Sequence, residues 1–153
     1  MGVPRLLILL IVLLAGCGAQ AAGPASVVTS NGPFKAEASP AHLAAGGTVQ
    51  VTLTVTGPIQ YEAGCVQTFG IWVVDSQNRQ VWAQPVPQVE CFALMNRSLA
   101  AGQTASFHAN WPTSATLAAG RYTIHGLFLT VVPLGAGARV RENMPPLTVT
   151  LTS

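Results

Sequence analysis

The chain has 153 residues, enough for one domain with a leader and a tail. Half of its residues are hydrophobic and only 8% are charged, about a third of the usual ~25% for soluble domains. A surface with so few charges must carry threonine, serine, glutamine and asparagine, a composition more common outside cells than in the cytosol. The basic residues are scattered singly, so no basic stripe is present to neutralise phosphates, which argues against nucleic-acid binding.

Residues 1–16 have the pattern of a secretory signal peptide. Arg5 is followed by an unbroken apolar run, 6–15, and then by small residues. As a helix the run would span only about 15 Å, half of a hydrocarbon core, so it is too short for a stable transmembrane helix. We therefore expect the apolar core of a cleaved signal.

The residues that end this segment resemble the bacterial lipobox. They read Leu14-Ala15-Gly16-Cys17, directly after the apolar run. The resemblance implies that Cys17 is diacylated and becomes the new N-terminus, which would hold the chain to a membrane of the bacterial cell envelope, facing the periplasm or the exterior. The alternative is an ordinary secretory signal cut near 19–22, with a chance cysteine.

After Cys17 the chain is small, polar and interrupted by glycine and proline. We expect residues 17–33 to form the lipidated cysteine and a flexible tether, and residues 34–153 to form the folded domain.

From Phe34 onward the dominant period is two, which is typical of strands. In the segment 48–56 every odd position is apolar and every even position is polar, so one face is expected to be buried: Val49, Val51, Leu53 and Val55. Further strands are predicted at 69–74, 81–83, 104–111, 121–128 and 147–151, with a turn at 76–78 between the first two of these strands.

About seven strands, separated by glycine, proline, asparagine and serine, predict an all-β, immunoglobulin-like sandwich of two antiparallel sheets. A short helix-like pattern lies at about 92–99. Tyr122 stands just after Gly120, at the start of a late strand, which resembles a tyrosine corner, whose hydroxyl bonds to upstream backbone. The alternative is an ordinary core tyrosine.

The other two cysteines, Cys65 and Cys91, form an even pair in an exported chain, which predicts a disulfide. It would tie two loops together and stabilise the fold by about 3.5 kcal/mol on the chain-entropy model. Two free structural thiols are the alternative, and the spacing excludes a CxxC redox motif.

Three segments resemble the BsuPI-type intracellular proteinase inhibitors, a family with an immunoglobulin-like fold. They are 74–82 (VDSQNRQVW), 99–104 (LAAGQT, followed by Phe107 and Trp111) and 119–123 (AGRYT). The resemblance implies stoichiometric contact between a loop and a protease, with 62–66 and 133–141 as candidate loops. Two features depart from the family: this chain is exported, and the Cys65/Cys91 pair is extra. No inhibitory loop maps onto the matching residues.

Few residues suggest chemistry. His108 and His125 both fall on the polar phase of their strands, where adjacent strands would bring them together, but a third metal ligand is lacking, because His42 lies far away in the sequence. Surface or cross-strand histidines are the better interpretation. The carboxylates show no catalytic pairing, and Asp75 is expected to cap the turn that follows it. We therefore predict no catalytic residues, no metal and no cofactor.

Trp72, Trp82 and Trp111 are expected in the core, although Trp72 is out of phase with Ile71 and Val73. The sequence as a whole predicts a membrane-anchored, non-catalytic binding or structural module of the cell envelope, with a protease or another envelope protein as partner. A proteinase inhibitor is the alternative.

Overall fold

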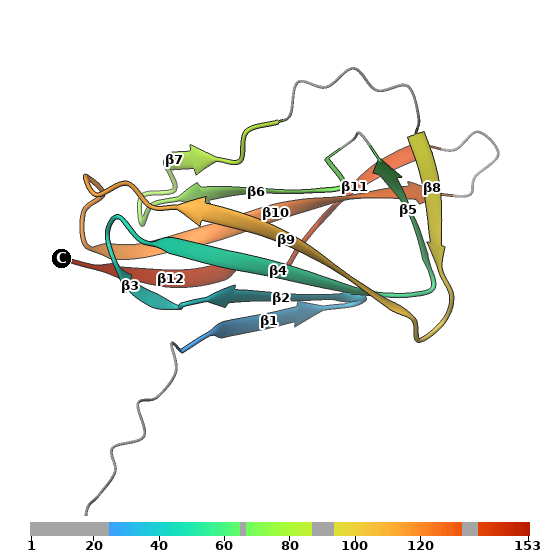
Figure 1. Cartoon of the computed structure of the whole chain (residues 1–153), viewed down its shortest axis with the longest axis horizontal. Helices are drawn as coiled ribbons and strands as arrows, with labels where there is room; N and C mark the ends of the chain where they lie inside the picture. The colour runs from blue at the N-terminus through green and yellow to red at the C-terminus, as the bar shows by residue number, and fades with distance from the viewer. Residues whose placement is uncertain (1–24, 65–66, 87–93, 133–137) are drawn as a thin grey trace, which may run out of the picture.

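The computed structural model describes residues 25–64, 67–86, 94–132 and 138–153, and within these ranges the chain forms strands and turns without a helix. Two sheets pack face to face (Figure 1). The strands are β1 (Val27–Asn31), β2 (Phe34–Ser39), β3 (His42–Ala44), β4 (Thr48–Thr56), β5 (Ile59–Gly64), β6 (Phe69–Val74), β7 (Gln80–Ala83), β8 (Leu94–Leu99), β9 (Thr104–Pro112), β10 (Gly120–Val132), β11 (Ala138–Asn143) and β12 (Leu147–Thr152).

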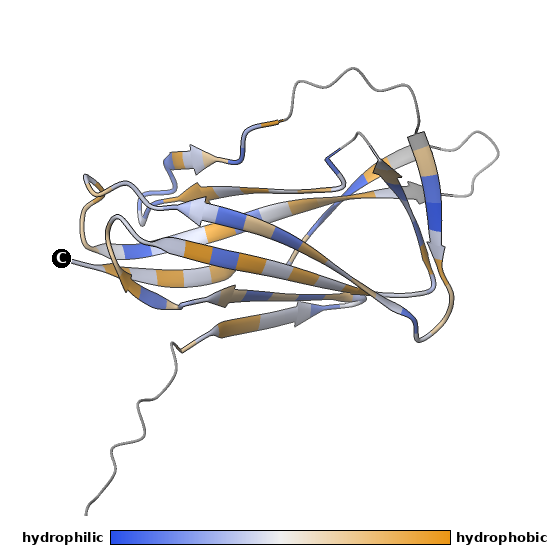
Figure 2. Ribbon diagram, viewed as in Figure 1, coloured by the Kyte–Doolittle hydropathy of each residue, from blue (hydrophilic) through white to orange (hydrophobic). Residues whose placement is uncertain are grey.

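Sheet A has the strand order β1-β2-β4-β9, and all of its pairs are antiparallel. Strand β4 has the bounds that its alternation predicts, and its four apolar side chains are fully buried: Val49, Val51, Leu53 and Val55. Burying a side chain of this size stabilises the fold by about 1.5–3 kcal/mol. The alternation appears in Figure 2 as orange and pale or blue bands along the strands.

Sheet B has eight strands and is organised around the long strand β10. The first part of β10 pairs with β12 on one side and with β6 on the other, and its last part pairs with β11. Strand β7 extends the sheet beyond β6, and β3 lies parallel to β12 at the opposite edge. Strands β6 and β10 are therefore inner strands of sheet B, and β7 and β3 are the edge strands on either side of them.

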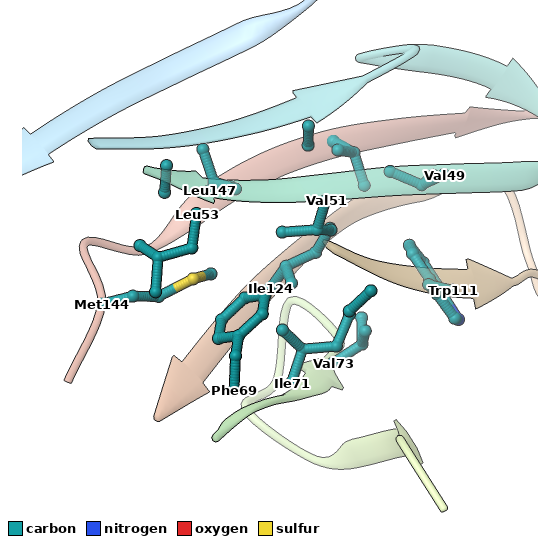
Figure 3. Packing of buried hydrophobic residues seen from close by; sticks show 14 of the residues in the cluster. Val49, Val51, Leu53, Phe69, Ile71, Val73, Trp111, Ile124, Met144 and Leu147 are labelled. Carbon is teal, nitrogen blue, oxygen red and sulfur yellow. The ribbon is translucent and has the colours of Figure 1, made fainter. Parts of the chain in front are cut away.

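The core lies between the two sheets (Figure 3). Side chains of β6 and β10 meet those of β4 and β9, and Trp111 of β9 is fully buried among them. At one end Phe128 joins the sheets, because its ring lies 4.9 Å from Phe107 and 5.8 Å from Phe34, measured between ring centroids. Aromatic pairs of this kind add about 0.5–1.5 kcal/mol to the area that they bury.

The all-β, two-sheet immunoglobulin-like sandwich is confirmed, with more strands than the pattern predicts. Two local predictions are wrong. The segment 17–33 is not a tether throughout, because β1 lies within it and pairs with β2. The helix-like segment 92–99 contains strand β8, which pairs with β5, so tertiary pairing overrides the local pattern. The expected signal helix lies outside the described residues.

Candidate functional site

One tryptophan points out of sheet B instead of into the core. Ile71 and Val73 on β6 are 3% and 0% exposed and belong to the core, whereas Trp72 between them is half-buried and does not. Because successive side chains of a strand point to opposite faces, Trp72 lies on the outer face of sheet B. The alternation of the sequence already marks Trp72 as out of phase with Ile71 and Val73. The general expectation that all three tryptophans lie in the core is wrong for Trp72.

His125 of β10 lies directly opposite Trp72 in the register of the two strands. Their ring centroids are 5.2 Å apart and the ring planes differ by 15°, so the imidazole stacks on the indole. The histidine is half-buried as well. One face of Trp72 is therefore covered by a cross-strand partner, as the interpretation of a cross-strand histidine expects.

The other face of Trp72 looks toward β7, where its ladder partner is Ala83. Ala83 is exposed, and its side chain ends at Cβ. Opposite Cβ atoms in a sheet lie about 4.5–5.5 Å apart, and the indole extends well beyond its own Cβ. The methyl group of Ala83 therefore does not cover the outer part of this indole face.

The neighbouring outward positions are uncharged. Thr123 is the ladder partner of both Val74 and Thr148, one row from the tryptophan, and Leu127 pairs with Gly70 in the next row on the other side. Thr123, Thr148 and Leu127 are half-buried. We call the following six outward residues the tryptophan surface: Trp72, Ala83, Thr123, His125, Leu127 and Thr148.

Adjacent strands do not bring His108 and His125 together as metal ligands, in line with the preferred interpretation of surface or cross-strand histidines. His108 lies on β9 in sheet A and His125 on β10 in sheet B, and both point outward, so they lie on opposite sides of the sandwich. The Nδ1 atom of His108 instead lies 3.1 Å from the Oγ1 atom of Thr52 across sheet A. Among the described residues, no group of three or more His, Cys, Asp and Glu side chains is placed to hold a metal ion.

Asp75 caps the β6–β7 turn, as predicted. Its Oδ1 atom accepts hydrogen bonds from the backbone N–H groups of Gln77 and Arg79, each at 2.9 Å, and its Oδ2 atom accepts one from Nε of Arg79 at 2.8 Å. Asn78 takes the left-handed conformation in this turn, with φ of 60°. The backbone hydrogen bond from Arg79 is the main cause that lowers the pKa of Asp75. This carboxylate is therefore structural.

The tyrosine corner is present. The hydroxyl of Tyr122 donates a hydrogen bond of 2.8 Å to the backbone carbonyl of Ala118, and the side chain is 6% exposed. Its ring centroid lies 5.7 Å from that of the buried Trp111. Trp82 also packs against the core, so two of the three tryptophans have the expected core position.

Several predicted sites lie outside the described residues: the lipid attachment at Cys17 and the disulfide between Cys65 and Cys91. The candidate inhibitory loops 62–66 and 133–141 are described only in part. These predictions, and the inhibitor alternative that depends on the loops, stay predictions. Within the described residues, no helix has the length and apolar character that crossing a bilayer requires.

Comparison with known proteins gives a structural likeness alone. No family model matches the chain, and no curated protein matches it. Among solved structures, the fold is similar to the crystal structure of the C-terminal domain of Wzt, with a TM-score of 0.51 and 13% sequence identity over 85% of this chain and 80% of that chain. At this identity the likeness supports the β-sandwich fold and nothing beyond it.

Proposed function

We propose that the chain is a non-catalytic binding module, held to a bacterial membrane by a lipid on Cys17, and that it binds its partner through the tryptophan surface. The observation that carries the proposal is the outward position of the half-buried Trp72, stacked on one face by His125 and opposite the short side chain of Ala83 on the other. Tryptophan is among the residues that contribute most to binding energy at protein surfaces.

The two outer faces of the sandwich differ, which favours this side. The outer face of sheet A carries a polar ladder in which Thr52 pairs with His108 and Thr54 with Ser106, and their side chains contact one another. Such a face is satisfied by its own hydrogen bonds and by water. The outer face of sheet B instead presents partly exposed apolar side chains that do not belong to the core, among them Trp72.

The position of the chain entry is consistent with this arrangement. The described chain enters through β1, which is the edge strand of sheet A (Figure 1). A lipid anchor that precedes β1 would therefore join the domain at sheet A. The tryptophan surface on sheet B would then be presented away from the point of attachment.

Site-specific photo-crosslinking in living cells tests the proposal. A photoreactive amino acid replaces Gln80, which is exposed on β7 opposite Val74 and one row from Trp72, or Gln50, which is exposed on the outer face of sheet A, in the full chain. We expect an adduct from position 80 that disappears when Trp72→Ala is added, and no such adduct from position 50. Equal adducts from both positions, or none from position 80, would contradict the proposal.

A further inference from the structure

We propose that the ligand of the tryptophan surface is a neutral carbohydrate chain, one sugar ring of which stacks on the face of Trp72 that looks toward β7. This inference rests on the proposed function and assigns its ligand class.

The shape of the open position is the first reason. His125 covers one face of the indole, and the short, exposed side chain of Ala83 lies opposite the other, so a flat group can lie over Ala83 and against Trp72. The face of an aromatic ring carries partial negative charge. The C–H groups on one side of a sugar ring are weakly positive and nearly coplanar, which makes them complementary to such a face.

The polar groups beside the indole are the second reason. Thr123 lies diagonally from Trp72 across β6 and β10, about 7–8 Å away and on the β10 side of the indole, where it can meet the sugar unit that follows the stacked ring in the chain. Thr148 lies opposite Thr123 on β12. Among the described residues, neither hydroxyl makes a side-chain hydrogen bond, so both are available to the hydroxyl groups of a sugar.

The charge of the surface is the third reason. None of its six residues is an aspartate, glutamate, lysine or arginine. The nearest turn does carry charges, but there Asp75 and Arg79 neutralise one another at 2.8 Å. Arg121 points outward farther along β10, two residues beyond Thr123, and Arg141 is exposed on β11 opposite Leu129, beyond the other end of the surface. A surface with an aromatic platform, hydroxyl groups and no net charge fits an uncharged polyhydroxylated ligand better than an acidic one.

Binding of defined oligosaccharides to the full chain, purified in mild detergent, tests the inference. The probes are neutral hexasaccharides of glucose, of mannose and of N-acetylglucosamine, and an acidic oligogalacturonate, and the readouts are saturation-transfer NMR and tryptophan fluorescence. We expect at least one neutral probe to bind. Trp72→Ala should weaken its binding by a factor of at least ten.

A second variant keeps the test decisive if Trp72→Ala disturbs the fold. Ala83→Phe leaves Trp72 in place but covers its open face, and an aromatic residue is well tolerated at an exposed strand position. It should weaken binding as strongly as Trp72→Ala. The matched control is Ala44→Phe, an exposed position on β3 at the opposite edge of sheet B, which should bind like the unmodified chain.

The outcomes separate this inference from the proposed function. Absence of binding by every neutral probe, or binding that neither Trp72→Ala nor Ala83→Phe weakens, would overturn the carbohydrate assignment. Tighter binding of the acidic probe, abolished by Arg121→Ala, would overturn it as well. If a protein is crosslinked from position 80 while all neutral probes fail, the ligand class is wrong and the binding module stands. Failure of both experiments would refute both.

Discussion

Tyr122→Phe should destabilise the domain through the loss of one hydrogen bond. The hydroxyl of Tyr122 donates to the backbone carbonyl of Ala118 at 2.8 Å, in a position where the side chain is 6% exposed. The phenylalanine ring keeps the packing against Trp111 but leaves the carbonyl without this donor. This hydrogen bond is part-buried and Ala118 is exposed, so water can hydrate the freed carbonyl, and we expect the free energy of unfolding to fall by about 0.5–1.5 kcal/mol.

Urea unfolding, followed by circular dichroism, measures this effect. With a slope of about 1–3 kcal/mol per molar urea, the midpoint should fall by roughly 0.5 M while the slope stays unchanged. The control is Tyr61→Phe, because the Tyr61 hydroxyl makes no hydrogen bond within the described residues while its ring packs on Phe107 and Phe128. A midpoint for Tyr122→Phe that equals that of Tyr61→Phe would refute the reasoning.

Three further predictions concern the anchor, the cysteine pair and the β6–β7 turn. Metabolic labelling with a fatty acid should mark the chain, and Cys17→Ala should abolish the label; a label that persists in this variant excludes the anchor. Mass spectrometry without reductant should find a linked peptide pair containing Cys65 and Cys91, and alkylation of both thiols in the unreduced chain would speak against the disulfide. Because the folded pKa of Asp75 is lowered from its ordinary value of 3.8, the ionised carboxylate stabilises the fold above that value, and this stabilisation is lost as the pH falls through the folded pKa. Asp75→Asn should therefore lower the unfolding temperature at pH 7 and lower it progressively less as the pH falls below 3.8, and a loss that stays constant down the pH series would contradict the role of the charge.

The strands that the sequence predicts best are those with a buried face. In β4 a bulky apolar residue occupies every second position, and the predicted and observed bounds agree. Strand β2 follows the same alternation, but its inward residues after Phe34 are Ala36 and Ala38. Alanine is only weakly hydrophobic, so the inward and outward positions of this strand differ little in the sequence. Edge strands such as β1 and β8 pair with a neighbour on one side only. Pairing with that neighbour, more than their own residues, determines that they form strands, so local patterns do not reveal them.

The candidate site was predictable only in part, for a similar reason. That Trp72 is out of phase with Ile71 and Val73 is visible within a few residues of sequence. That His125 stacks on Trp72 depends on the register of β6 and β10. Along the chain these two strands are separated by β7, β8 and β9. The same non-local information places His108 in the other sheet. Alternation therefore predicts which face a side chain occupies but does not identify its neighbours.

Hydroxyl-radical footprinting in intact cells tests most directly whether the tryptophan surface is occupied. Trp72 is half-buried on that surface, and Met95 is 46% exposed on β8, away from it, so the oxidation of Met95 provides an internal reference. We expect the ratio of oxidation at Trp72 to oxidation at Met95 to be lower in cells than in the purified full chain, and Ala44→Phe to leave this difference unchanged. An equal ratio in cells and in the purified chain would contradict the claim that this surface binds a partner.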